Sequence, residues 1–517
     1  MRVVLILFLL FSLAWLTLNA QSTDAFPVRT TVAEGTIEGN YNTKTGIQTY
    51  LGVPFAQPPV GDLRWQPPQP AKPWSGVKET KQFSARPIQK FIFGDMRFRS
   101  SGVSEDCLYL NVWTPAKKDT KGLPVLLYYY GGGNTAGAAD EIRYDGTTLA
   151  GKDVIVVTAN YRLNVFGFLA HPELSAESDY GGSGNYGHMD QAAALRWVYD
   201  NIAAFGGDPR QITIAGESAG SMGVSIQMAS PLSRDLLAGA LGQSGAYFGR
   251  LAISSLAEGE KAGENFLKAT GYPSIAALRK APVRDIYETF FESDDNFSMP
   301  EVVDGYFLDA TVADVFAAGK QAKIPLMGGW TSAEVAWLSA PESAEAYVAG
   351  VKGQFPENYA AVLEHYPATD PHRSQTDLAS DNWIVYATWK WLEEHRRTSG
   401  QPVYRYRFDR VRPPLVGQTR EQDPIGAGHA SDIEYFMGSL PLADEYAWQD
   451  ADRETSATMV GYLVNFIKTR NPNGAGLPEW SPTSGGEAQP VMLLDREVKQ
   501  VTFDDVRYRF WDRTSQK

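Results

Sequence analysis

Continuous apolar runs alternate with amphipathic stretches through the middle of the chain. Residues 125–130 and 154–158 are apolar or aromatic almost throughout, which is typical of parallel strands buried on both faces. Residues 191–204 carry apolar side chains at three- and four-residue spacing and predict an amphipathic helix. Further core strands are predicted at 211–215, 237–241, 324–327 and 403–408. This alternation indicates an α/β fold with a mostly parallel central sheet and helices on both faces.

Strand-forming residues also cluster in the first third of the chain. Residues 32–37, 46–51 and 108–113 combine β-formers with turn residues, and 378–396 is a long helical stretch. No internal repeat, low-complexity tract or Pro/Ser-rich linker divides residues 21–517. We therefore expect a single domain over residues 21–517.

Residues 1–20 have the pattern of a secretory signal peptide. A short basic start is followed by an apolar run over 3–18, and Ala20 supplies a small residue at the expected cleavage point. The alternative is an N-terminal membrane anchor, for which this run is slightly short. The pattern predicts export, secreted or periplasmic, with no stable membrane insertion after cleavage.

Charge and cysteine content narrow the functional classes. The net charge is −13, with 43% hydrophobic and 21% charged residues, which fits a globular protein and argues against nucleic acid as a partner. Cys107 is the only cysteine, so no intrachain disulfide or cysteine-rich metal site can form. We expect neither a metal nor a cofactor.

Residues 216–220 carry the most informative motif of the chain. They read Gly-Glu-Ser-Ala-Gly, between the predicted strand 211–215 and a predicted helix start at 221–228. Strand, G-x-S-x-G and helix in this order indicate a nucleophile elbow, in which a strained turn presents the serine hydroxyl. Ser218 is therefore the predicted nucleophile.

A serine nucleophile needs a base, and the order of such triads places the base after the acid. His365, His372, His395 and His429 follow Ser218 with room for an acid between. His395 is expected to be a surface residue near a helix end, and His365 and His372 flank a turn that is expected to be solvated. His429 lies in a loop of small residues and is the favoured base.

The acid and the oxyanion donors are expected in loops at strand ends. Glu334 follows the predicted strand 324–327 and its glycines, whereas Asp304 precedes a glycine and also suits a plain turn. Gly132 and Gly133 follow the strand 125–130, and their backbone N–H groups, with that of Ala219, are the predicted oxyanion donors. A flexible turn or a phosphate loop is the alternative, but the P-loop pattern is absent.

The chain resembles the type-B carboxylesterase/cholinesterase family of α/β-hydrolases, and in particular its bacterial para-nitrobenzyl-esterase-like members. The matching segments run in order along nearly the whole mature chain: LGVPFAQPPVGDLRW (51–65), SEDCLYLNVWTP (104–115), NYRLNVFGF (160–168), GNYGHMDQ (184–191), FGGDP (205–209) and GAGH (426–429). The resemblance implies Ser218, Glu334 and His429 as nucleophile, acid and base. It also implies structural ion pairs between Arg64 and Glu105 and between Arg162 and Asp190.

Four positions depart from the family pattern. The cysteine that usually pairs with the one at 107 is missing, and residues 91–107 contain no tryptophan, so acetylcholine is not the expected substrate. Tyr130 stands where the common pattern has histidine. His188 stands where the family usually has an apolar residue, and we expect a buried histidine with satisfied hydrogen bonds or, as the alternative, a substrate-pocket residue.

Together these features predict a serine carboxylic-ester hydrolase that acts on a small-molecule ester through an acyl-enzyme. The alternatives are a non-catalytic adhesion or binding protein on the same fold and a lipase acting at an interface. For Arg97 and Arg99 there are two interpretations: they face an acidic substrate, or they lie in a solvated loop. Six aromatic residues could line the substrate gorge or belong to the core: Phe91, Phe93, Tyr247, Phe248, Trp330 and Trp337.

Overall fold

The computed structural model describes residues 28–115, 121–420 and 424–514. The predicted signal peptide, residues 1–20, lies outside the described residues, so its cleavage and export stay predictions. Within the described part of the chain, no helix has both the length and the apolar character needed to cross a membrane.

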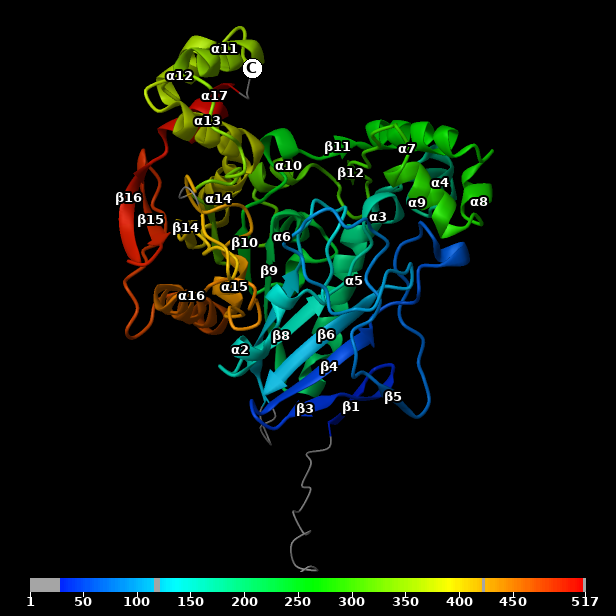
Figure 1. Cartoon of the computed structure of the whole chain (residues 1–517). Helices are drawn as coiled ribbons and strands as arrows, with labels where there is room; N and C mark the ends of the chain where they lie inside the picture. The colour runs from blue at the N-terminus through cyan, green and yellow to red at the C-terminus, as the bar shows by residue number, and fades with distance from the viewer. Residues whose placement is uncertain (1–27, 116–120, 421–423, 515–517) are drawn as a thin grey trace, which may run out of the picture.

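One large sheet runs through the centre of the molecule (Figure 1). It has eleven strands in the order β16-β15-β14-β13-β10-β9-β7-β8-β6-β4-β3. Their bounds are β3 Asn40–Asn42, β4 Ile47–Pro54, β6 Tyr109–Pro115, β7 Leu123–Tyr129, β8 Ile155–Ala159, β9 Gly207–Glu217, β10 Gly239–Gln243, β13 Leu326–Thr331, β14 Val403–Phe408, β15 Ala488–Leu494 and β16 Lys499–Asp504.

The strands from β15 to β8 are parallel, and antiparallel strands flank them at both edges. The mostly parallel sheet of the sequence-based prediction is thus confirmed. Two small sheets lie outside it: β1 Arg29–Val32, β2 Gly35–Glu38 and β5 Val77–Glu79 form one, and β11 Ser254–Ser255 and β12 Val302–Val303 form the other.

Apolar side chains on alternate positions of the central strands enter two separate cores. In β7, Leu127 and Tyr129 belong to the core on one face, and Leu126 and Tyr128 belong to the core on the other. This is why the sequence of the strand is a continuous apolar run. Among the helices with side chains in the first core, α5 Tyr186–Asn201, α6 Ala219–Ala229 and α14 Tyr386–Ser399 pack directly against the sheet. On the second face, α2 Thr147–Ala150 and α16 Asp450–Thr469 contact the sheet, and α15 Ile433–Met437 packs aromatic rings on β14.

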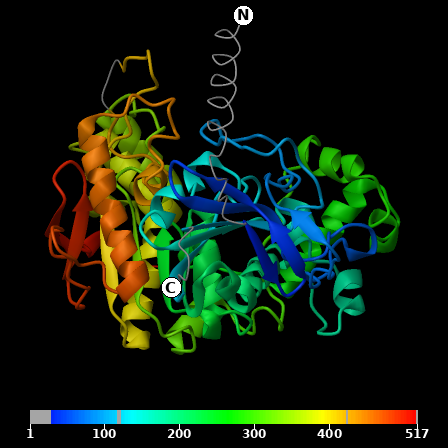
Figure 2. The same cartoon turned by 90° about the horizontal axis from the view of Figure 1, so that it is seen from below.

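The remaining helices gather mainly in two groups above the sheet in the view of Figure 1. One group holds α11 Ala344–Gln354, α12 Tyr359–His365, α13 Pro371–Ser380 and α17 Val506–Thr514. The other holds α4 Pro172–Glu177, α7 Leu256–Thr270, α8 Ile275–Leu278 and α9 Val283–Phe291, with α3 Asn164–Phe168 below α7. Helix α10 Val312–Ala317 lies between the two groups. Below them, α16 lies near the edge formed by β15 and β16 in both views (Figure 2).

Two local predictions are confirmed in more detail, and one is wrong. Residues 32–37 hold a turn between two strands, β1 and β2, with Gly35 at a φ of +154°. The stretch predicted at 378–396 is helical throughout, and a π-helical turn over Asp381–Val385 joins α13 to α14. His395 is fully buried in α14 and hydrogen-bonds the carbonyl of Ile324, so the expected surface position is wrong.

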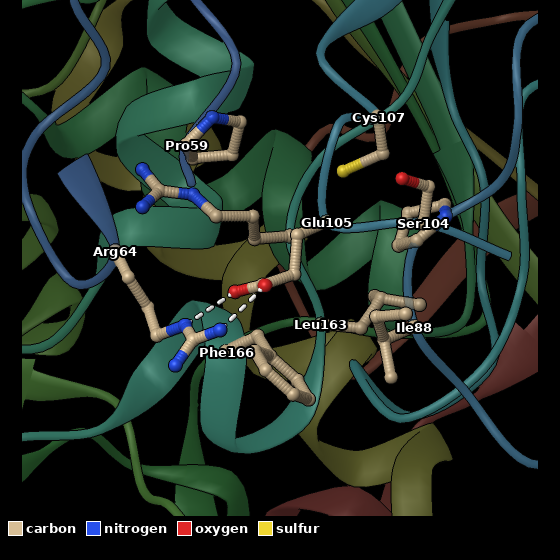
Figure 3. Close-up of a pocket in the computed structure, with 10 residues that line it drawn as sticks. Pro59, Arg64, Ile88, Ser104, Glu105, Cys107, Leu163 and Phe166 are labelled. Atoms are coloured by element: carbon tan, nitrogen blue, oxygen red, sulfur yellow. Dashed lines mark hydrogen bonds and ion pairs between the residues drawn. The ribbon is translucent and has the colours of Figure 1, made fainter. Parts of the chain in front are cut away.

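Two buried ion pairs expected from the family resemblance are present. Arg64 forms two hydrogen bonds to Glu105, of 2.6 and 2.7 Å, and both side chains are less than one-tenth exposed (Figure 3). The same guanidinium donates to the carbonyls of Leu278, Arg279 and Ala281, so it ties an early loop to the α8 region. Arg162 and Asp190 form the second pair at 2.8 Å.

Cys107 lines the small pocket beside the Arg64–Glu105 pair (Figure 3). It is free and buried, and burial raises the pKa of its thiol well above the usual value. A protonated, inaccessible thiol is a weak nucleophile, so Cys107 acts as a small core side chain.

Replacing Arg64 by methionine should destabilise the protein by about 3–5 kcal/mol, because it leaves the carboxylate of Glu105 buried without its partner. Arg29→Met is the matched control, since Arg29 pairs with Glu38 at a side-chain exposure of 59% and should contribute at most about 1 kcal/mol. Urea unfolding of both variants measures the difference. Equal midpoints for the two variants would contradict this account.

Candidate active site

Ser218 occupies the sharp turn between β9 and α6. Its backbone has φ 55° and ψ −123°, a strained conformation for a residue with a side chain. The turn needs two glycines: a Cβ on Gly216 would lie 2.4 Å from the carbonyl of Gly220, and a Cβ on Gly220 would lie 2.1 Å from the carbonyl oxygen of Tyr129. The elbow predicted from the motif is therefore the local structure.

The structure brings together the three side chains that the sequence singled out. His429, in the segment between β14 and α15, has Nε2 2.8 Å from Oγ of Ser218 and Nδ1 2.6 Å from Oε2 of Glu334. Glu334 lies in the turn after β13 and is fully buried. Its other oxygen accepts hydrogen bonds from the backbone N–H of Thr331 and the hydroxyl of Ser244.

The loops that carry Glu334 and His429 are joined directly to each other. The N–H of Ala427 donates to the hydroxyl of Ser332, and the N–H of Ala333 donates to the carbonyl of Ala427. A Cβ on Gly426 would lie 2.8 Å from the Ser332 hydroxyl, which explains the glycine at this position. Asp304, the alternative acid, instead accepts three backbone N–H groups of its own turn.

The glycine loop after β7 lies against the elbow. A Cβ on Gly131 would come within 3.1 Å of Cβ of Ser218, so the two segments touch. Gly132 and Gly133 have φ values of +110° and +64°, which favour glycine. Tyr130, which precedes the loop, forms three hydrogen bonds with Tyr161 and stacks on its ring at 4.2 Å between centroids. The loop is thus anchored where it leaves the strand.

Glu217 is a buried carboxyl group that sequence reasoning did not select. One of its oxygens lies 3.2 Å from Nε2 of His429, and the side chain is 3% exposed. Burial raises the pKa of Glu217 to about 8. Burial lowers the pKa of His429, but the nearby carboxylates of Glu217 and Glu334 outweigh it and raise that pKa to about 9. The motif gives no signal for this role, because its second position accepts any residue.

Comparison with known proteins identifies the family of the chain. The model of the carboxylesterase family matches residues 25–511. The chain belongs to the carboxylesterase family. It is therefore a serine hydrolase of carboxylic esters with the α/β-hydrolase fold.

Curated relatives cover most of this esterase. It is 36% identical over 447 residues to fumonisin B1 esterase of Sphingopyxis macrogoltabida, covering 81% of this chain and 76% of that protein. It is 33% identical over 511 residues to rabbit (Oryctolagus cuniculus) liver carboxylesterase 1, covering 88% of each. Human (Homo sapiens) cocaine esterase is 31% identical over 542 residues, covering 96% of this chain and 93% of that protein.

A cavity of about 390 Å³ opens beside Ser218 in the esterase. This volume suits a small ligand. The wall is mixed in polarity. Polar residues such as Asn134, Arg250 and Glu301 line it together with apolar side chains, among them Phe168, Met222, Leu251, Phe290, Phe297 and Met299. Trp383, from the π-helical turn, also lines the cavity and packs on the ring of His429 at 4.7 Å. π-helical turns often occur at functional sites.

Most of the aromatic residues proposed for a gorge lie elsewhere. Among the described lining residues only Tyr247 comes from that set. Phe248 and Trp330 are buried in the core, as their alternative interpretation held, and Phe91 and Trp337 are 68% and 64% exposed. His188 is fully buried and hydrogen-bonded through both ring nitrogens, as expected.

The two arginines considered for an acidic substrate are engaged with the esterase's own acids. Arg97 pairs with Asp444 and Glu445, and Arg99 lies 2.6 Å from the carboxylate of Asp145. Neither lines the cavity beside Ser218, but Arg250 does. Arg250 is exposed and forms no hydrogen bond or ion pair with another described residue.

We therefore expect the double variant Arg97→Ala/Arg99→Ala to keep the preference of the esterase between neutral and anionic esters. Arg250→Ala should lower kcat/KM for the anionic ester about 3- to 10-fold relative to the neutral one, through loss of one cationic contact. p-Nitrophenyl butyrate and mono-p-nitrophenyl succinate form a matched pair of substrates. If the ratio of kcat/KM for the two esters changes in the double variant and not in Arg250→Ala, then Arg97 or Arg99, and not Arg250, contacts the anionic substrate.

Proposed function

We propose that the enzyme hydrolyses small carboxylic esters through an acyl-enzyme on Ser218, with His429 as base and Glu334 as the orienting acid. The observation that carries the proposal is the unbroken chain of contacts from the hydroxyl of Ser218 through both nitrogens of His429 to Glu334, at 2.8 and 2.6 Å. Nucleophile, base and orienting group within hydrogen-bond distance are the signature of an activated serine.

In the first half of the reaction, Oγ of Ser218 attacks the ester carbonyl carbon and its proton moves to Nε2 of His429. The bond to the alcohol oxygen then breaks, and His429 returns the proton to the leaving alcohol. In the second half, water attacks the acyl carbon and gives a proton to His429. The bond to Oγ of Ser218 then breaks, His429 returns the proton to Oγ, and the carboxylic acid is released. Glu334 holds the ring with Nδ1 protonated and stabilises the imidazolium that forms in both halves.

The negative charge on the carbonyl oxygen needs donors on the opposite side of the reacting carbon. The N–H groups of Gly132, Gly133 and Ala219 are proposed for this role, because the glycine loop and the first residue of α6 flank Ser218. Both Gly133 and Ala219 line the cavity. Backbone donors fixed before the reaction stabilise the oxyanion without reorganisation.

The cavity suggests the class of ester. The apolar side chains in the wall and a volume of about 390 Å³ favour an ester with an apolar acyl or alcohol group of small to medium size. The names of the relatives include esterases of larger compounds, a mycotoxin and cocaine. We therefore propose small carboxylic esters as the substrate class.

Ser218→Ala should lower kcat for p-nitrophenyl butyrate at least about 10⁴-fold, and Glu334→Gln about 10⁴-fold, because each removes a member of one catalytic unit. Stopped-flow assays of the unmodified enzyme should show a nitrophenol burst equal to the enzyme concentration if deacylation is the slower step. Ser293→Ala is the control, since Ser293 is exposed and does not line the cavity. Retained turnover in Ser218→Ala would refute the proposal.

The pH profile should depend on Glu217. Catalysis needs neutral His429, so kcat/KM should rise with pH as that residue loses its proton. Glu217 contributes to the raised pKa of His429, and Glu217→Gln should therefore shift this rise to lower pH. Glu357→Gln, at an exposed position, should leave the profile in place. An unchanged midpoint in Glu217→Gln would show that Glu217 is uncharged where His429 titrates.

A further inference from the structure

Asn134 directly follows the glycine loop and is held by two partners in the cavity wall. It is 7% exposed and adopts the left-handed conformation, with φ +53°. Its amide nitrogen donates one hydrogen bond to the hydroxyl of Tyr247, at 3.0 Å, and one to the carboxylate of Glu301, at 2.7 Å. Both N–H bonds of the side chain are thereby used. All three residues line the cavity beside Ser218.

The chain of hydrogen bonds continues away from the cavity into the core. The hydroxyl of Tyr247 lies 2.8 Å from Nε2 of His188, and Nδ1 of His188 lies 3.0 Å from the amide oxygen of Gln191. That oxygen also accepts from the amide nitrogen of Gln227, at 3.2 Å, which fixes it as an acceptor. His188 is fully buried, and burial lowers its pKa, so the ring is neutral.

The acceptor role of Gln191 sets the direction of the hydrogen bonds in this chain. Because Gln191 presents oxygen, Nδ1 of His188 carries the proton and Nε2 accepts. Tyr247 then donates to His188, and its oxygen is free to accept from Asn134. The carboxylate of Glu301 accepts the second N–H of Asn134, so a flipped amide would place two oxygens together. The amide of Asn134 is therefore locked from both sides.

We propose that Glu301 and Tyr247 are positioning residues for the oxyanion hole, acting through Asn134, with His188 orienting the Tyr247 hydroxyl. This inference rests on the proposed function, in which Gly132 and Gly133 supply oxyanion donors. Asn134 is bonded to Gly133, so a fixed Asn134 fixes the peptide planes of the loop before it. The left-handed backbone of Asn134, which asparagine adopts more readily than most residues, places its amide between Tyr247 and Glu301.

The expected kinetic signature follows from this role. Oxyanion donors interact more strongly with the tetrahedral intermediate than with the bound ester, so a misplaced loop lowers kcat and changes KM little. A purely structural role of the same hydrogen bonds would lower the stability of the protein and leave kcat per active site unchanged. The two roles are therefore separable by experiment.

The test inverts the polarity of the Asn134–Glu301 contact. Asn134→Asp keeps the shape of the side chain, removes both donors and places two carboxylates together, so kcat should fall about 10- to 100-fold. In Asn134→Asp/Glu301→Gln the introduced amide at position 301 donates to the introduced carboxylate at position 134, so the hydrogen bond returns in the reversed direction. The kcat of this double variant should be at least about fivefold higher than that of Asn134→Asp. Asn358→Asp is the matched control at an exposed position outside the cavity wall.

Tyr247→Phe provides a second variant that fills the same volume, should Asn134→Asp fail to fold. It removes the acceptor of Asn134 and should lower kcat about 3- to 10-fold with a KM within twofold of the unmodified enzyme. All rates are measured with p-nitrophenyl butyrate, divided by the active-site concentration from the nitrophenol burst, and accompanied by thermal unfolding of each variant.

The outcomes distinguish a failure of the positioning role from a failure of the proposed function. A fall in kcat for Asn134→Asp that the double variant partly reverses, or a selective fall for Tyr247→Phe, supports the positioning role. An unchanged kcat in the folded variants, or equal losses in the single and double variants, overturns it. Turnover that is retained in the Ser218→Ala variant would instead overturn the proposed function, whatever the kinetics of the Asn134 variants.

Discussion

The close contact between the elbow and the neighbouring strand is the constraint on which the site depends. Gly220 approaches the carbonyl of Tyr129 so closely that a Cβ would lie 2.1 Å from it, and Gly131 meets Ser218 in the same way. The end of β7, the glycine loop and the start of α6 therefore form one packed unit. Any side chain at these glycines would separate the serine from the loop beside it, because backbone atoms cannot yield as flexible side chains do.

Parallel strands supply the rest of the arrangement. Glu334 follows β13 and His429 follows β14, and these strands are paired in parallel next to β10 and β9. Segments that leave the carboxyl ends of such strands emerge at one edge of the sheet, where they meet Ser218. Glu217 is buried beside His429. The protonation of each of these two residues therefore depends on the other.

Much of the fold could be predicted because the central strands are buried on both faces. The apolar runs at 125–130 and 154–158 correspond to β7 and β8, and the motif at 216–220 lies between β9 and α6. The short edge elements carry weaker signals, since exposed positions tolerate polar residues. The burial of His395 is not predictable from its place near a helix end, because the sequence does not show which elements pack against that helix.

The sequence by itself determined the elbow, the glycine loop and the identity of Ser218, Glu334 and His429 as candidates, since motif, spacing and chain order are local properties. Only the tertiary structure decided which polar side chains surround them. Glu217, Asn134, Tyr247 and Glu301 come from separate segments and share no pattern, and Arg97 and Arg99 are paired with acids far along the chain. Burial and charge at a site depend on contacts between distant residues, which no local pattern encodes.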